Sequence, residues 1–228
     1  MTTYVLVPGG WRGAWTWDAV VSLLESAGHI AHPVTLTGLG PGDDPEEIAS
    51  ANLDTHADDV LRLITSNHLT DVTLVGHSYG GMVVSVVADR AGGRVSRVVH
   101  LDAYVPLDGE SCWSATNDTF RAIFAAGAAE NGYTVRHPRR DADPRTRPHP
   151  LAAFMQAARL TGAVDEVPRR DFVYCSGWAD TPFTELRDRL RDDPNWTVHD
   201  IPTGHDVANL APEAVAAILL NGTANDSH

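Results

Sequence analysis

Residues 71–81 read Asp-Val-Thr-Leu-Val-Gly-His-Ser-Tyr-Gly-Gly, and this stretch decides how the rest of the chain is interpreted. A short apolar run, typical of a buried strand, ends directly on Gly76-His77-Ser78-Tyr79-Gly80. A serine on a strand-to-helix turn needs strained backbone angles, and glycines two residues to either side let the strand and the helix approach without a Cβ clash. Residues 82–88, Met-Val-Val-Ser-Val-Val-Ala, can continue as a buried helix, as the motif requires. Ser78 is therefore the first candidate for a covalent catalyst.

Short apolar, β-branched runs alternate with helical patterns along the rest of the chain. Strands are predicted near residues 3–7, 29–34, 71–76, 96–102, 171–176 and 196–201, and helices near 16–27, 54–66, 79–91, 182–191 and 211–220. Strands that alternate with helices indicate an α/β fold with a mostly parallel, six-stranded sheet between helical layers. Residues 35–52, which contain several glycines and prolines, are expected to form a long loop.

Residues 106–170 interrupt this alternation, because they separate two predicted strands by far more than an ordinary crossover needs. We expect a core of residues 1–105 and 171–228, with residues 106–170 inserted as a lid. The lid holds apolar residues suited to lining a pocket: Trp113, Phe120, Phe124, Phe154 and Met155. Its residues 136–150 also contain five arginines against two aspartates. This stretch is either a solvated loop or, through Arg139 and Arg140, an anchor for an anionic group of the substrate.

The composition limits the classes of function. A chain of 228 residues, 43% of them hydrophobic, can bury one sizeable core. The formal net charge of -13 disfavours nucleic acid as a partner, and all 17 basic residues are arginines, which excludes lysine-based catalysis. The first predicted strand leaves no room for a signal peptide, and no apolar run reaches a membrane span, so a soluble, cytoplasmic protein is expected. Cys112 and Cys175 are expected to be buried thiols.

The base that would activate Ser78 is sought among the eleven histidines, since a serine hydroxyl is a poor nucleophile until a base takes its proton. His205 lies in a loop, residues 201–206, just after the last predicted strand, where a turn can aim the imidazole over the strand ends. His77 is too close to Ser78 along the backbone to face it. We expect His205 to be the base; the alternative is a loop histidine that merely caps the last helix.

Two aspartates compete to orient the imidazole. The acid should follow a strand between the serine and the histidine, because hydrolases with this elbow present Ser, Asp or Glu, and His in that chain order. Asp180 follows the strand near 171–176 in a polar loop, and Asp102 ends the strand near 96–102. We favour Asp180 and keep Asp102 as the alternative acid; Asp180 could instead serve the start of the helix near 182–191.

The oxyanion formed on attack needs two preorganised donors. One would be the backbone N–H of Tyr79, and the other should come from the loop after the first strand, where Gly10 is the favoured donor. Trp11, in the same loop, is expected to contact the substrate together with Trp113, Phe120 and Phe124. Dinucleotide binding is the rival for this Gly-Gly pair, but the Gly-x-Gly-x-x-Gly spacing is not evident.

These motifs resemble the α/β-hydrolase superfamily, in particular the small esterases that include plant methyl-salicylate-type esterases, the hydroxynitrile lyases and bacterial esterase-like relatives. The resemblance rests on residues 4–15, on residues 76–81, on Asp180 with Pro182-Phe183, and on Gly204-His205. It implies a three-layer fold and places the nucleophile at Ser78, the base at His205, the acid at Asp180 and the oxyanion donors at Gly10 and Tyr79.

The chain departs from this family at several positions. Pro8 stands where members usually have a histidine, whose hydrogen bond steadies the oxyanion loop. Gly9 and Asp206 replace a threonine and a lysine of the lyases, and both differences favour an esterase.

We therefore expect a serine hydrolase that cleaves a small or medium carboxylic ester or lactone through an acyl-enzyme, with no cofactor and no metal. One alternative is a lyase that uses the same site for elimination or C–C cleavage. Another is a ligand-binding receptor on a hydrolase scaffold. The expected partner is a small molecule, with no nucleic acid and no membrane, and the oligomeric state stays open, a homodimer included.

Overall fold

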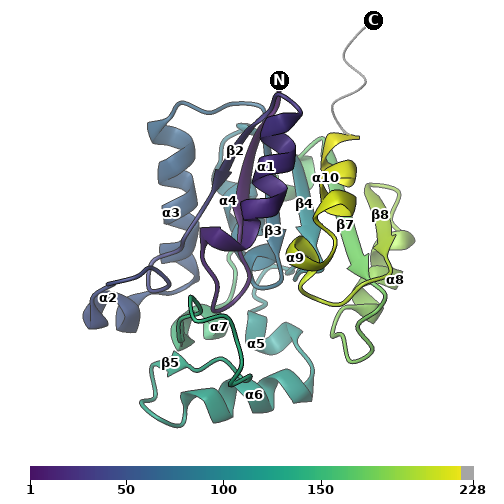
Figure 1. Ribbon diagram of the computed structural model, residues 1–228. Helices are drawn as coiled ribbons and strands as arrows, with labels where there is room; N and C mark the ends of the chain where they lie inside the picture. Colours follow the sequence, from purple (N-terminus) through teal and green to yellow (C-terminus); the bar gives the residue numbers. More distant parts are fainter. Residues whose placement is uncertain (222–228) are drawn as a thin grey trace, which may run out of the picture.

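A computed structural model describes residues 1–221, and a six-stranded sheet with helices on both faces forms its centre (Figure 1). The strands are β1 (Thr3–Val7), β2 (Ile30–Pro33), β3 (Val72–His77), β4 (Val95–Leu101), β7 (Arg169–Cys175) and β8 (Trp196–Ile201). Their order is β2-β1-β3-β4-β7-β8, and every neighbouring pair runs parallel. The predicted α/β fold with a parallel, six-stranded sheet is confirmed.

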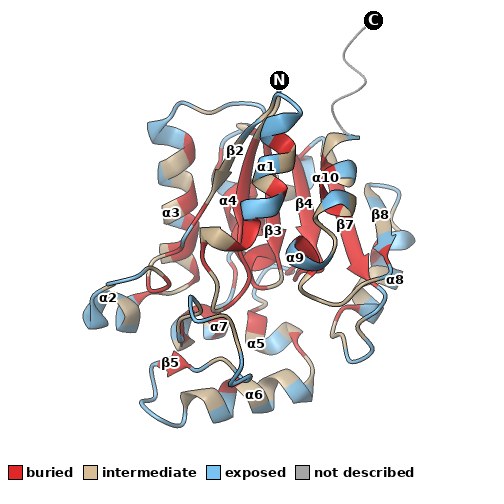
Figure 2. Ribbon diagram, viewed as in Figure 1, coloured by how far each residue is buried: buried red, intermediate tan, exposed pale blue. Residues whose placement is uncertain are grey.

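Helices cover both faces because the strands bury both of their faces. Tyr4 and Leu6 of β1 face α1 (Asp18–Ser26) and α10 (Pro212–Leu220), whereas Val5 and Val7 face the opposite way. The second face is covered by α3 (Leu53–Ser66), α4 (Gly80–Arg90) and α8 (Thr184–Arg191). The central strands and α4 are almost wholly buried (Figure 2). This gives the expected three layers; two short helices, η1 (Ala14–Trp17) and α9 (Val207–Leu210), flank the strand ends.

One sequence prediction of a loop is wrong in part. Within residues 35–52, the structure has a helix, α2 (Pro45–Ser50). Asp44 and Glu47 form a capping box at its start, and Pro45 occupies the first turn, where its fixed φ and missing N–H carry no penalty. The high glycine and proline content of residues 35–52 led to the loop prediction, although the capping residues that start α2 stand in the same stretch.

The segment between β4 and β7, residues 102–168, is called the insertion below. Its elements are α5 (Cys112–Ala115), α6 (Asp118–Ala128), β5 (Thr134–Val135), β6 (His149–Pro150), α7 (Leu151–Met155) and η2 (Ala163–Glu166). The elements from α5 to α7 gather beyond the carboxyl ends of the strands (Figure 1), whereas η2 packs against α4. The carboxylate of Asp89 in α4 ties the last part of the insertion to the core by accepting hydrogen bonds from the backbone of Thr161, Gly162 and Val164.

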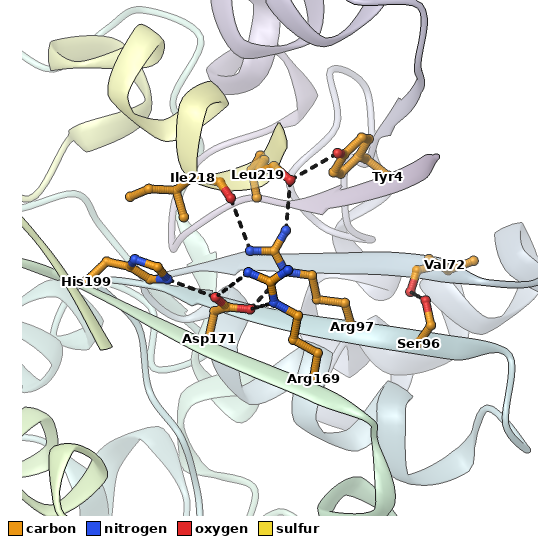
Figure 3. A network of polar contacts seen from close by, with 9 residues as sticks. All are labelled: Tyr4, Val72, Ser96, Arg97, Arg169, Asp171, His199, Ile218 and Leu219. Carbon is orange, nitrogen blue, oxygen red and sulfur yellow. Dashed lines mark hydrogen bonds and ion pairs between the residues drawn. The ribbon is translucent and has the colours of Figure 1, made fainter. Parts of the chain in front are cut away.

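A buried charged network fixes the last helix to the sheet (Figure 3). Asp171 is fully buried and accepts hydrogen bonds from Arg97, Arg169 and His199. Its burial opposes ionisation, but the bonds from His199 and Arg97 outweigh it and lower the pKa of the carboxyl group. Arg97 also donates to the carbonyls of residues 218 and 219, near the negative end of α10.

The strand order locates a binding site before any side chain is considered. Chain connections run from β1 to β2 on one side and then return to β3 on the other, so the direction of winding reverses between β1 and β3. Ligands of open parallel sheets bind outside the strand carboxyl ends at such a reversal. The loop after β1 and the turn after β3 meet there. No helix in residues 1–221 combines the length and apolar character needed to cross a membrane.

Candidate active site

Ser78 stands on a sharp turn between β3 and α4 with φ at 54°, in the left-handed region that non-glycine residues rarely adopt. The neighbouring glycines are required by close packing. A Cβ on Gly76 would lie 2.5 Å from the Gly80 carbonyl oxygen, and one on Gly81 would lie 2.1 Å from the Tyr104 carbonyl oxygen. The turn leaves the serine partly exposed.

The imidazole of His205 lies between Ser78 and Asp102. Its Nε2 is 2.9 Å from Ser78 Oγ, and its Nδ1 is 2.6 Å from Asp102 Oδ2. Asp102 is fully buried at the end of β4, in a positive-φ conformation (45°), and its Oδ1 accepts a hydrogen bond from Cys175 N–H at 3.0 Å. A neutral imidazole that donates from Nδ1 to the carboxylate has Nε2 free to accept the serine proton.

The preference for Asp180 as the partner of His205 is corrected by this geometry, and Asp102, the alternative, holds that place. Both ring nitrogens of His205 are already engaged, one by Ser78 and the other by Asp102. Asp180 is exposed on the loop that leads to α8. The sequence could not discriminate between them, because a carboxylate after β4 and one after β7 both satisfy the expected chain order.

Two further rings hold His205 in place. The rings of Trp178 and His77 lie with their centroids 4.1 Å and 4.7 Å from that of His205. His77 Nε2–H donates to the His205 carbonyl at 2.8 Å. Burial, reinforced by the nearby His205 and Arg12, lowers the pKa of His77 well below 6.5, so its ring stays neutral.

The loop after β1 lies against Ser78. A Cβ on Gly9 would lie 3.0 Å from Ser78 Cβ, so a side chain at this position would have to displace its neighbours. Gly10 is buried beside it, and Trp11 follows with φ at 65°. Arg12 forms a 2.6 Å ion pair with Asp206, which joins this loop to the residue after His205.

Tyr79, the residue after Ser78, is fixed by its side chain. Its hydroxyl donates to His56 Nδ1, and His56 Nε2–H donates to the Thr37 carbonyl, both at 2.8 Å. Burial lowers the pKa of His56 to about 4 and raises that of Tyr79 well above 10. Both groups therefore stay neutral near pH 7, and the backbone N–H of Tyr79 stays at the start of α4.

Aromatic side chains from the insertion extend the site. Trp11 and Phe124, both expected to bind substrate, have ring centroids 6.2 Å apart, and Phe124 in turn contacts Trp113 and Phe120. Phe120 also contacts Trp178, which links this cluster to His205. The ring of Phe154 stacks on that of Phe124 with centroids 4.3 Å apart, and both rings are buried in the hydrophobic core. Met155 does not join it, because its side chain is 45% exposed.

Sequence reasoning missed four functional-site neighbours: His56, His77, His149 and Trp178. Hydrophobic periodicity can indicate that a histidine on a helix or beside a glycine turn is buried, but it does not indicate which residue that histidine contacts.

The two arginines expected to bind an anion lie on the surface of the insertion. Arg139 is engaged in a bidentate ion pair with Asp141, and both side chains are more than two-thirds exposed. Arg139 and Arg140 line a hollow of about 290 Å³ formed by residues 136–148, which include none of Ser78, His205 and Asp102.

Both cysteines are free and buried, as predicted. Among residues 1–221, no three acidic, histidine or cysteine side chains converge in a way that could hold a metal ion.

Comparisons with known proteins relate the chain to hydrolases in sequence and in fold. The sequence model of the Alpha/beta hydrolase family matches residues 4–218. The carbendazim hydrolyzing esterase of Nocardioides sp. (strain SG-4G) is 33% identical over 241 residues, covering 96% of this chain and 98% of that protein. Methylesterase 1 of Arabidopsis thaliana is 32% identical over 118 residues, which span 51% of this chain and only 44% of that protein.

A solved structure extends the likeness over the whole fold. An extracellular alpha/beta-hydrolase from a Paenibacillus species superposes with a TM-score of 0.83 at 21% identity, over 97% of this chain and 98% of that one.

Proposed function

The chain belongs to the alpha/beta hydrolase family, and we propose that it hydrolyses small or medium carboxylic esters or lactones through an acyl-enzyme on Ser78. The observation that carries the proposal is the continuous relay from Ser78 Oγ through His205 to Asp102, with contacts of 2.9 Å and 2.6 Å. Full-length similarity to an esterase supports ester hydrolysis as the reaction class.

In the proposed mechanism, Ser78 Oγ attacks the ester carbonyl carbon while His205 Nε2 takes the hydroxyl proton. Asp102 holds the imidazole in the Nδ1–H form and stabilises the imidazolium. His205 then returns the proton to the departing alcohol, leaving an acyl group on Ser78. A water molecule, deprotonated by the same Nε2, attacks the acyl carbon; the acid leaves and Ser78 regains its proton.

The backbone N–H groups of Gly10 and Tyr79 would bind the oxyanion of each tetrahedral intermediate. Their candidacy is supported by the close approach of the Gly9-Gly10 backbone to Ser78 and by the fixed side chain of Tyr79 at the start of α4. Each donor is worth about 10²–10³-fold in kcat in other hydrolases.

Residues 106–170, which include most of the insertion, would act as a lid over this site. It supplies Trp113, Phe120 and Phe124, which with Trp11 would contact the apolar part of the substrate. Arg139 and Arg140 stay candidates for an anionic substrate group; the ion pair of Arg139 with Asp141 would have to open first.

The direct test is reaction with a fluorophosphonate followed by intact-mass and peptide-mass analysis. The expected result is one adduct per chain, on Ser78, and no adduct in Ser78→Ala. Turnover of p-nitrophenyl acetate by Ser78→Ala should be lower by about 10³-fold or more. Near-native turnover in that variant would exclude the acyl-enzyme.

Two rival functions predict other outcomes. A lyase would release products without incorporating ¹⁸O from labelled water, whereas hydrolysis places the label in the acid. A receptor would bind esters tightly with little turnover. Carbendazim and methyl esters are sensible first substrates, given the names of the relatives of the chain.

A further inference from the structure

Trp11 joins the loop after β1 to the insertion by three hydrogen bonds. Its backbone N–H donates to His149 Nδ1 at 3.2 Å, and its carbonyl accepts from Arg147 N–H at 3.0 Å. Its indole Nε1–H donates to the Val135 carbonyl at 2.7 Å. The backbone N–H, the carbonyl and the indole of Trp11 are therefore all held by the insertion, more than a hundred residues further along the chain.

His149 is the one side chain among these partners. It is fully buried in β6, and its ring stacks on Phe154 with centroids 4.1 Å apart. Because Trp11 N–H is a donor, Nδ1 must be the bare acceptor, and the ring proton of the neutral imidazole lies on Nε2.

The Nε2 atom of His149 is buried and has no hydrogen-bond partner within residues 1–221. A buried donor without a partner costs free energy, so a phenylalanine would serve better if the position existed for stacking alone. The His149 imidazole has a hydrogen-bond acceptor at Nδ1, which a phenylalanine ring lacks.

The accepted bond acts on the backbone next to the oxyanion donor. Trp11 has φ at 65°, a strained conformation that persists only where the surroundings hold it. With its N–H committed to His149, Trp11 is not free to bind an oxyanion, which leaves Gly10 N–H as the donor from this loop. A rotation of the Trp11 backbone would turn the Gly10–Trp11 peptide, and Gly10, which has no Cβ to restrict its own dihedral angles, would pass that change on to its N–H.

We propose that His149 is a positioning residue: through Trp11, it fixes the oxyanion loop and makes the oxyanion hole depend on the docked insertion. The inference rests on the proposed function, because it assigns work to a hydrolytic oxyanion hole. It adds that the insertion, besides covering the substrate, completes the electrostatic part of the site.

The experiment compares His149→Phe, which keeps the stacked ring but removes the acceptor, with His149→Asn, whose Oδ1 can accept near the Nδ1 position. His137→Phe is the matched control. The His137 ring also contacts the Trp11 ring, with centroids 5.3 Å apart, but it accepts no hydrogen bond from the Trp11 backbone. Active sites are counted with paraoxon, folding is checked by thermal melting, and kcat and KM are measured with p-nitrophenyl acetate.

His149→Phe should lose about 10- to 100-fold in kcat per titrated site, somewhat less than deletion of a whole oxyanion donor, with KM changed less than about threefold. His149→Asn should recover most of that loss, and His137→Phe should behave as wild type. His149→Leu serves as the acceptor-free variant if His149→Phe does not fold.

An unchanged kcat in a folded, acceptor-free variant would overturn the proposal, and so would equal losses in the phenylalanine and asparagine variants or a loss confined to KM. Failure of the proposed function has a different signature: wild-type protein would then neither react with paraoxon nor hydrolyse the ester.

Discussion

Replacing Asp102 by asparagine should cripple turnover, because the structure dictates how the new amide must sit. Asp102 Oδ1 accepts from Cys175 N–H at 3.0 Å, and Oδ2 faces His205 Nδ1 at 2.6 Å. In Asp102→Asn, only the amide oxygen can face the Cys175 donor, so the NH₂ group must face His205. It would then donate to Nδ1 and force the ring proton onto Nε2.

An imidazole protonated at Nε2 cannot accept the proton of Ser78. Loss of the correct tautomer in this way costs about 10⁴-fold in kcat, equivalent to about 5 kcal/mol of transition-state stabilisation. The opposite amide orientation offers no escape, because it would set two donors against each other in a site where Asp102 is fully buried.

The assay is steady-state hydrolysis of p-nitrophenyl acetate, with active sites counted by fluorophosphonate labelling over hours and folding followed by thermal melting. Asp180→Asn is the control; it lies on the surface, away from both ring nitrogens of His205, and should keep kcat within about twofold of wild type. The reasoning fails if Asp180→Asn is the more damaging change, or if a folded Asp102→Asn retains a tenth of wild-type kcat.

Three further predictions concern packing, pH and specificity. Gly81→Ala should destabilise the fold by several kcal/mol in urea unfolding, since the new Cβ would lie 2.1 Å from the Tyr104 carbonyl oxygen; a change below about 1 kcal/mol would contradict this. The free energy of unfolding should fall by about 3 kcal/mol as the pH drops from about 6.5 to 4. Burial lowers the pKa of His56 to about 4, so the unfolded state binds the proton at a higher pH than the folded state does. His56→Gln should flatten the pH dependence of the unfolding free energy, and an unaltered slope would assign it to other groups. Replacing Arg139 and Arg140 by glutamine should raise KM for anionic esters at low ionic strength and leave KM for neutral esters unchanged, if these arginines bind substrate; equal changes in KM for both classes, or no change in either, would mark the two arginines as solvated surface.

The core of the fold could be predicted because its signals are local. Apolar runs define all six strands of the sheet to within two residues, and the elbow motif locates the turn at Ser78. The helix α2 was missed, since its start depends on a side-chain capping box inside a stretch with loop-like composition.

The partners of the elbow depend on contacts between distant parts of the chain. His205 was identified from its place after the last strand, and the structure sets its ring 2.9 Å from Ser78 Oγ. The choice between Asp102 and Asp180 needed the three-dimensional position of two strand ends, because an aspartate follows each of them. His149 could not be found at all, because its contact with Trp11 spans 138 residues and leaves no periodic pattern.

The strained backbone of this site also sets a condition for engineering the protein. Ser78 and Asp102, like Trp11 beside them, hold positive φ angles, and each such residue costs about 1 kcal/mol or more that a glycine would recover. At Ser78, whose hydroxyl contributes little packing, a library screened only for heat resistance would therefore enrich glycine and discard the proposed nucleophile; at Trp11 and Asp102, the side-chain hydrogen bonds described above oppose the same exchange. Any search for a more stable variant therefore has to select for turnover in every round, because glycine at position 78 would raise stability and abolish the proposed activity.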